Sequence, residues 1–287
     1  MVVFTYSNVN EASKAEIVII GVPDEKKSHS KRKGTSKGPD VLRMVNNESN
    51  FFERGGSTIP ICPMRGNIVE KYIFDYGNVK KEELYRIVFQ LVSNKKVPII
   101  IGGDHSVTSI ILKAIGDSIG KVGLLYFDAH PDFVSSTTDY YGSVLTDSSK
   151  WIDFNESLLI GTRSAELEEL ENAQNSGIEI ITPLDINEKG IGKIMDKVRA
   201  KHHRSKKYIS IDLDCLDPAY APGVSVPSAG GLSSIDLISL VKLAASLGII
   251  GLDIVELSPD FDVNNTTAIL TSRILLESIA SIDVNRY

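Results

Sequence analysis

Three short stretches of this 287-residue chain place histidine and aspartate directly after runs of apolar residues. In the first stretch, the apolar residues 97–101 are followed by two glycines, Asp104 and His105. Glycine permits an abrupt turn, so His105 is delivered at the end of an expected strand. Taken alone the pattern is a weak signal, because a single histidine in a turn is more often a hydrogen-bonded loop residue than a metal ligand.

The second stretch follows the apolar residues 122–127 and contains Asp128, His130 and Asp132. Residues two apart on a strand point to the same face, so Asp128 and His130 can converge, while Pro131 ends the strand and lets Asp132 turn over from the loop. Imidazole together with carboxylates suits a divalent transition metal. The alternative is that these residues only form turns and helix caps.

The third stretch places Asp212 and Asp214 at the end of the apolar run 208–211, again on one face. Two unpaired carboxylates at the end of a buried strand repel each other and are costly to desolvate, and a cation removes both costs. Asp217, which precedes Pro218, is expected to be a turn residue instead.

The three stretches together supply two histidines and four aspartates. In parallel α/β sheets ligands bind beyond the carboxyl ends of the strands, where all six residues are expected. Four carboxylates balance two divalent cations, and such a pair can lower the pKa of a bridging water so that it acts as a nucleophile near neutral pH. The sequence therefore predicts a two-metal hydrolytic site made of these residues: His105, Asp128, His130, Asp132, Asp212 and Asp214.

The elements that must position these residues alternate between apolar runs and longer amphipathic segments. Strands are expected at residues 17–22, 97–101, 122–127, 158–161, 208–213 and 249–255. Helices are expected at residues 81–94, 107–114, 164–176, 191–200, 234–246 and 265–280. This alternation predicts an α/β fold with a parallel sheet wrapped by helices. Because no repeat or Pro/Gly/Ser-rich linker interrupts it, residues 1–287 are expected to form a single domain.

Composition narrows the class of protein. A net charge of −6 with dispersed Lys and Arg argues against a nucleic-acid partner. The one basic run, residues 26–37, is expected to be a solvated, mobile loop. No apolar stretch reaches the roughly 18 to 20 residues of a membrane helix. Cys62 and Cys215 lie far apart and no secretory signal precedes them, so we expect a cytoplasmic protein without a disulfide framework.

The motifs resemble a known family. Gly-Gly-Asp-His-Ser at residues 102–106, Asp-Ala-His-x-Asp at 128–132 and Ser-Ile-Asp-x-Asp-x-x-Asp-Pro at 210–218 resemble, in order and separation, the three signatures of the ureohydrolases, the arginase and agmatinase superfamily. Residues 18–23, 32–43 and 74–79 are also similar to segments of that family, so the resemblance spans nearly the whole chain. It implies one ureohydrolase domain, a three-layer sandwich with a central, mostly parallel sheet flanked by helices, and a homo-oligomer, either trimer or hexamer.

The resemblance also implies two Mn²⁺ ions per chain. Asp128 and Asp212 would bridge them, and the remaining ligands would complete one site with His105 and Asp132 and the other with His130 and Asp214.

Beyond the ligands, Glu256 at another strand end matches the family glutamate that pairs with the guanidinium of the substrate. A carboxylate suits that task because it accepts two parallel N–H bonds. The alternative for Glu256 is a surface acid beyond the strand. Asp132 matches the family residue that shuttles the proton. His202 and His203 match no motif and are expected to be solvated.

The sequence departs from the family at two places beside the expected pocket. Tyr141 stands where the family usually has a histidine, and a phenol is a poor proton shuttle at neutral pH. Val-Ser-Val-Pro-Ser at residues 224–228 replaces the family's Thr-Gly-Thr-Pro-Glu, which puts Val226 in place of a threonine. Residues 133–140 also lack the polar loop with which arginases recognise the amino-acid end of arginine.

The missing polar loop favours an agmatinase over an arginase; an agmatinase converts agmatine and water to putrescine and urea and so serves polyamine biosynthesis. Tyr141 and the segment 224–228 instead leave a reduced rate or another substrate open. The small guanidino substrate could instead be that of a guanidinobutyrase, an arginase or a formiminoglutamase. Two other classes stay open: a one-metal amidohydrolase of the histone-deacetylase type, and a metal-bound homologue with little or no turnover that acts as a binding or assembly subunit.

Overall fold

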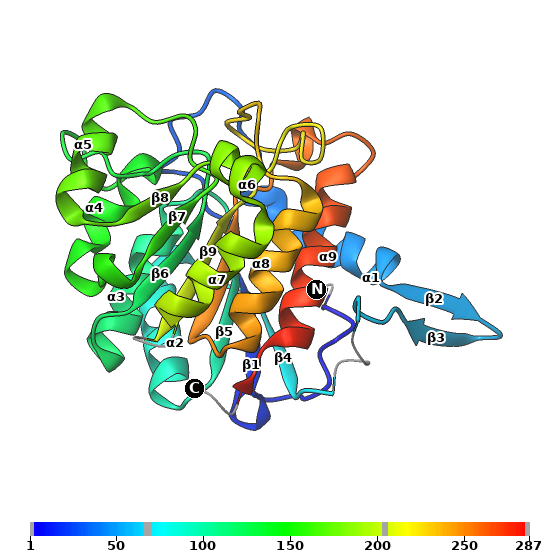
Figure 1. Ribbon diagram of the computed structural model, residues 1–287. Helices are drawn as coiled ribbons and strands as arrows, with labels where there is room; N and C mark the ends of the chain where they lie inside the picture. The colour runs from blue at the N-terminus through cyan, green and yellow to red at the C-terminus, as the bar shows by residue number, and fades with distance from the viewer. Residues whose placement is uncertain (1–2, 66–69, 203–205, 285–287) are drawn as a thin grey trace.

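A computed structural model describes residues 3–65, 70–202 and 206–284 of the chain (Figure 1). Its main feature is one eight-stranded sheet with the strand order β4-β1-β5-β10-β9-β6-β7-β8, in which every neighbouring pair is parallel. The strands are β1 (Ile17–Gly21), β4 (Ile73–Asn78), β5 (Val97–Ile101), β6 (Gly123–Phe127), β7 (Leu158–Ile160), β8 (Glu179–Ile181), β9 (Lys207–Asp212) and β10 (Gly251–Val255).

Helices cover both faces of the sheet. They are α1 (Gly38–Ser49), α2 (Lys81–Ser93), α3 (Val107–Ile119), α4 (Val144–Ser148), α5 (Leu167–Ser176), α6 (Pro183–Lys189), α7 (Ile191–His202), α8 (Ser234–Ser246) and α9 (Thr266–Ser281). One apolar cluster joins the sheet to α1 and α6 to α9, and a second joins the other face to α2 to α5. The predicted three-layer α/β sandwich is therefore confirmed.

The expected strands are all present because their sequences are apolar enough to be buried on both faces. Every residue of β1, β5, β6, β9 and β10 is buried. The two strands that the sequence did not predict, β4 and β8, are the edges of the sheet, where burial is partial and the residues are mixed. The periodicity of an edge strand is easily hidden, since one side of its backbone has no neighbouring strand.

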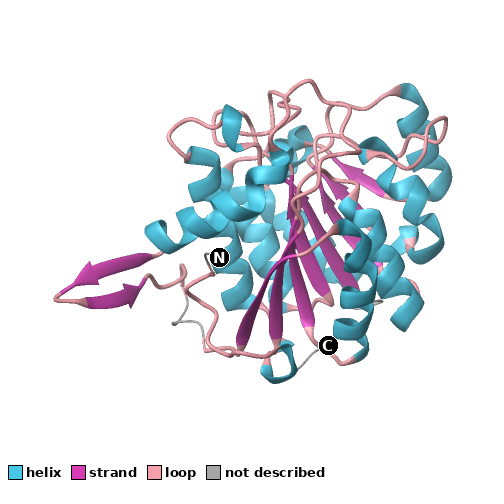
Figure 2. Cartoon of the chain, turned by 180° about the vertical axis from the view of Figure 1, so that it is seen from behind, coloured by secondary structure: helices cyan, strands magenta, loops and turns pink. Residues whose placement is uncertain are grey.

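A two-stranded antiparallel hairpin, β2 (Phe51–Arg54) and β3 (Ser57–Pro60), projects away from the body of the molecule in both overall views (Figures 1 and 2). Its turn is Gly55-Gly56, with φ of 59° and 77°. Glycine suits this turn because both positions need positive φ. The hairpin was not predicted either.

The prediction of a solvated loop for the basic run 26–37 is confirmed only in part: Lys26 and Lys37 are exposed, whereas Ser28 and Thr35 are buried and the run is held against neighbouring loops. The Arg32 guanidinium donates to the Pro222 carbonyl at 2.9 Å, and Lys37 Nζ lies 2.7 Å from a carboxylate oxygen of Asp260. The composition of a segment gives no sign of such partners, because they come from distant parts of the chain.

Of the predictions for single residues, one is confirmed and one is wrong. The Asp217 carboxylate accepts three backbone N–H bonds within its loop, which confirms the turn residue. His202 is half-buried and its Nε2 lies 2.6 Å from the Gly248 carbonyl, so the expectation that it is solvated was wrong; His203 lies outside the described residues.

Cys62 and Cys215 are free thiols. No helix in the described part of the chain is long and apolar enough to cross a membrane.

Candidate metal centre

The six residues predicted as ligands gather at the carboxyl edge of four adjacent strands, β5, β10, β9 and β6. Figure 2 shows these strands side by side, with loops gathered above their arrowheads. His105 follows β5 through the Gly102-Gly103 turn, Asp128 comes directly after β6, and Asp212 is the last residue of β9. Parallel strands thus deliver residues far apart in sequence to one place, as in other parallel α/β sheets.

The local geometry within each motif differs from the prediction. β6 ends at Phe127, and Asp214 lies in a short 3₁₀ turn after β9, so neither pair of ligands shares the face of a strand. Instead, the backbone N–H of His130 donates to Asp128 Oδ1 at 2.7 Å, and that of Asp214 donates to Asp212 Oδ1 at 2.8 Å. Aspartate side chains that cap the second following N–H form tight turns. Turn chemistry, and not strand alternation, brings the side chains together.

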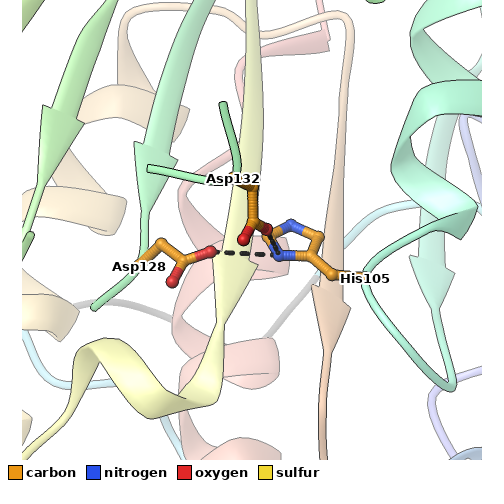
Figure 3. Close-up of side chains that lie close together, drawn as sticks. All are labelled: His105, Asp128 and Asp132. Carbon is orange, nitrogen blue, oxygen red and sulfur yellow. Dashed lines mark ion pairs between the residues drawn. The ribbon is translucent and has the colours of Figure 1, made fainter. Parts of the chain in front are cut away.

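A first group of side chains converges on Nδ1 of His105. This atom lies 3.1 Å from Asp128 Oδ2, 3.0 Å from Asp132 Oδ2 and 3.3 Å from Asp212 Oδ2. Figure 3 shows the carboxylates of Asp128 and Asp132 turned toward the same ring nitrogen of His105. All four side chains are buried, and three carboxylates surround one ring nitrogen of His105, an arrangement beyond that of the hydrogen-bonded loop residue given as the alternative.

A second group converges on Nδ1 of His130, which lies 3.4 Å from Asp128 Oδ1 and 3.2 Å from Asp214 Oδ2. Asp128 therefore belongs to both groups, with a different carboxylate oxygen turned to each. A carboxylate in that position is placed to bridge two cations.

The electrostatics of the metal-free cluster reflect crowded negative charge. Burial, with Asp132 and Asp214 beside it, raises the pKa of Asp128 to about 6, and burial with neighbouring carboxylates raises the pKa of Asp212. Burial alone would lower the pKa of His130, but Asp214 and Asp128 outweigh it and raise that pKa to about 12. Cations bound at the cluster would take over from these protons the balance of its negative charge.

The donor set fits divalent transition-metal cations. It combines imidazole nitrogen with carboxylate oxygen. Asp128 Oδ2 is buried, and next to neutral His105, whose Nδ1 lies 3.1 Å away and carries no proton, it accepts no hydrogen bond from the described residues; a cation can take that position.

A buried network behind His105 fixes which ring nitrogen faces the carboxylates. His105 Nε2 lies 2.9 Å from Ser210 Oγ, and Ser210 donates its hydroxyl proton to Asp253 Oδ1 at 2.7 Å. Since Ser210 has only one proton to give, Nε2 of His105 must be the donor to Ser210. In neutral His105 the lone pair is then on Nδ1, the atom that faces Asp128 and Asp132.

This network was not predicted from the sequence, although the sequence contains a sign of it. Asp253 is fully buried and also accepts hydroxyl protons from Thr108 at 2.8 Å and Tyr208 at 2.9 Å. Ser210 and Asp253 are polar residues inside otherwise apolar runs. A polar residue in a buried strand needs a partner, so both could have been identified as parts of a network.

Glu256 follows β10 and is only 1% exposed, so the alternative of a surface acid was wrong. Its Oε1 accepts the backbone N–H of His105 at 2.9 Å, and its Oε2 accepts a short hydrogen bond from Ser225. Burial raises the pKa of Glu256 to about 8. Its φ of 66° lies in the left-handed region, a strained conformation that non-glycine residues adopt mostly at functional sites.

A cavity of about 470 Å³ opens onto the cluster. Tyr141, from the stretch that departs from the family pattern, lines this cavity, and burial together with nearby Glu256 and Asp132 raises the pKa of Tyr141 to about 12. Val226 and Ser225 line it as well, so the departing segment 224–228 keeps one hydroxyl at the site. The other lining residues include His29, Tyr140, Glu166 and Glu169.

Comparison with known proteins gives concordant matches. The model of a family described as the arginase family matches residues 15–280. The agmatinase of Citrobacter koseri is 32% identical over 279 residues, which cover 93% of this chain and 87% of that protein. The crystal structure of agmatine ureohydrolase from Thermoplasma volcanium superposes with a TM-score of 0.81 at 28% identity, covering 98% of this chain and 94% of the other. Proclavaminate amidino hydrolase from Streptomyces clavuligerus shares the fold, with a TM-score of 0.84 at 24% identity, covering 100% and 98% of the two chains.

Proposed function

This chain belongs to the arginase family and is a ureohydrolase, and within that family we propose that it is a two-manganese agmatinase that converts agmatine and water to putrescine and urea. The observation that carries the choice of substrate is the charge of the cavity wall. Among the described residues that line the cavity there is no lysine or arginine, whereas Glu166 and Glu169 lie there outside the metal cluster.

Substrate classes of this family differ in the end that is remote from the guanidino group. Arginine and guanidinobutyrate carry a carboxylate there, and a carboxylate that enters a cavity needs a cation or several donors. Agmatine carries an ammonium, which acidic side chains stabilise. Glu169 is buried in the wall, accepts backbone N–H bonds from Phe133 and Glu166, and has its pKa raised to about 7 by burial. Glu166 is exposed at the cavity and is therefore the charge in this part of the wall that favours the ammonium end of agmatine.

The metal ligands in this proposal are the six residues of the cluster: His105, Asp128, His130, Asp132, Asp212 and Asp214. When bound, two Mn²⁺ ions would supply a nucleophile from water near neutral pH and Lewis-acid stabilisation of the developing charge. Asp128 and Asp212 would bridge the ions, His105 and Asp132 would complete one site, and His130 and Asp214 the other.

The remaining roles belong to groups around the cavity. Glu256 orients the guanidinium in its ionised form, which the nearby substrate cation favours against the raised pKa of the carboxyl. Each of its oxygens then has one protein donor and retains a lone pair for a substrate N–H. Asp132 lies both in the cluster and in the cavity wall, and there it takes the proton of the attacking water and returns it to the leaving amine. Tyr141 keeps its proton at neutral pH and donates a hydrogen bond to the substrate.

The test is urea release by the purified, Mn²⁺-loaded protein with agmatine, arginine, guanidinobutyrate and formiminoglutamate in parallel, with formamide also assayed for the last. We expect the highest kcat/KM for agmatine. A Glu166→Gln variant should raise the KM for agmatine without loss of bound metal. A preference for guanidinobutyrate or arginine would overturn the substrate, and one metal per chain by elemental analysis would favour the one-metal amidohydrolase class.

A second candidate is a metal-bound homologue with little or no turnover that serves as a binding or assembly subunit. It is favoured by Tyr141 and Val226, which line the cavity where the family usually has a histidine and a threonine. Two bound metals with no urea from any of the four compounds would support it. The trimer or hexamer and the cytoplasmic location stay predictions.

A further inference from the structure

Tyr126 is a fully buried tyrosine on β6, two residues before Asp128. Its ring lies parallel to the imidazole of His105, with 4.8 Å between ring centroids and 7° between planes. Its hydroxyl lies 2.6 Å from Asp132 Oδ2 and 3.2 Å from His105 Nδ1. One side chain therefore contacts two residues of the first group by three separate interactions.

The chemistry of these contacts fixes the direction of the hydrogen bond. An ionised carboxylate can only accept, so the phenol donates its proton to Asp132, and 2.6 Å is typical of a strong charge-assisted bond. The lone pairs of the phenol oxygen are left on the side of His105 Nδ1. Tyr126 has no proton to offer to a substrate, so its contribution is to hold other groups.

Asp132 needs such support because of its backbone. Its φ is 49°, in the left-handed region that costs a non-glycine residue free energy. It also follows the end of β6 by five residues, where the ladder no longer fixes the chain. The hydroxyl of Tyr126 ties this loop carboxylate to the rigid sheet, and the ring of Tyr126 limits the rotation of His105.

We propose that Tyr126 is a positioning residue for the cation held by His105 and Asp132, and that it makes this site bind more tightly than it would with those ligands alone. The inference rests on the proposed ligand set. The partners of the Tyr126 hydroxyl among the described residues, Asp132 and His105, both belong to the first group, so the effect of the hydroxyl is confined to one of the two sites.

The test compares Tyr126→Phe, which keeps the ring and removes the hydroxyl, with the wild-type protein. Both are stripped of metal and titrated with Mn²⁺ by calorimetry and by electron paramagnetic resonance, which distinguishes single from spin-coupled Mn²⁺. Groups that orient metal ligands typically change metal affinity by about 10- to 100-fold. We expect one site of Tyr126→Phe to weaken by that factor and the other to keep its wild-type affinity, so that the spin-coupled signal needs more metal.

The matched control is Tyr6→Phe, which removes the hydroxyl of another buried tyrosine, one that packs against Phe51. It should leave both affinities unchanged. Unchanged affinities in Tyr126→Phe, or equal weakening of both sites together with a lower melting temperature of the metal-free protein, would overturn the inference. A tyrosinate charge-transfer band in the Fe³⁺-loaded wild-type protein would also overturn it, because Tyr126 would then be a ligand. Fewer than two sites in the wild-type protein would instead count against the proposed metal centre.

Discussion

Removal of metal should lower the melting temperature, and the size of the effect follows from the number of proposed sites and from how far each is saturated. The cluster buries four carboxylates within reach of two histidines, His105 and His130. In the proposed two-metal site, chelation would take away two cations that stabilise the folded state and would leave the charge balance to protons. Because the raised pKa values of the histidines keep them protonated near neutral pH, the metal-free protein should still fold, but less stably.

The magnitude follows from linkage. A ligand at a hundred times its dissociation constant stabilises the folded state by about 2.7 kcal/mol, so two such sites contribute about 5 kcal/mol. For a chain of 287 residues, 1 kcal/mol corresponds to about 2 °C in Tm. Excess chelator should therefore lower Tm by about 10 °C.

The effect should also depend on pH with a definite sign. The folded pKa of Asp128 is raised to about 6, above its unfolded value, so ionisation of this carboxyl costs the metal-free protein stability above that range. The cost is relieved as pH falls through about 6. Protonation of the ligands also competes with metal binding at low pH. The difference in Tm between loaded and chelated protein should therefore shrink from pH 8 to pH 6.

The assay is differential scanning calorimetry of the loaded and chelated protein, with residual metal measured by elemental analysis. The variant Asp212→Asn should lose most of the difference, because it removes a proposed bridging ligand. As a matched control, Asp196→Asn changes an aspartate of α7 that pairs with Arg199 and should keep the full difference. An unchanged Tm after verified metal removal would refute the argument that buried carboxylates here need cations.

Three further outcomes are expected. Loading Mn²⁺ should release protons, because His105 and His130 are protonated in the metal-free protein, and equal calorimetric heats in buffers of different ionisation enthalpy would contradict this. Glu256→Gln should lower kcat/KM for agmatine about 100-fold with both metals retained, since hydrogen bonds to a charged group contribute about 1.5 to 3 kcal/mol each. A change in KM below threefold with unchanged kcat would show that Glu256 does not bind the substrate. Tyr141→His should raise kcat at pH 7 by about tenfold, because imidazole shuttles protons at neutral pH and a phenol with a pKa of about 12 does not. A lower kcat would show that the phenol itself is required.

The sequence was sufficient for the fold and for the position of the cluster because both depend on the central strands. An apolar run buried on both faces is visible in one dimension, and so are the polar residues that directly follow it, such as His105, Asp128 and Asp212. The prediction that Asp128 and His130 share one face of a strand was wrong. The residue at which strand pairing ends depends on the neighbouring strand and not on the apolar segment itself. The cluster formed nonetheless, since the aspartates make their own turns with the following N–H groups.

The pairing of residues across strands could not be predicted from the sequence. Ser210 and Asp253 can each be recognised as polar residues in buried strands. Their hydrogen bond depends on β9 lying beside β10, and the sequence of either strand does not show which strand is its neighbour. Tyr126 is harder still, because an aromatic residue in an apolar run is indistinguishable from ordinary core until Asp132 and His105 are placed against its hydroxyl and ring. The proposed metal ligands are thus predictable from their own chemistry, whereas the residues proposed to position them are defined by strand order. Substitutions at Tyr126 and Ser210 therefore test the proposed centre more directly than substitutions of the ligands do.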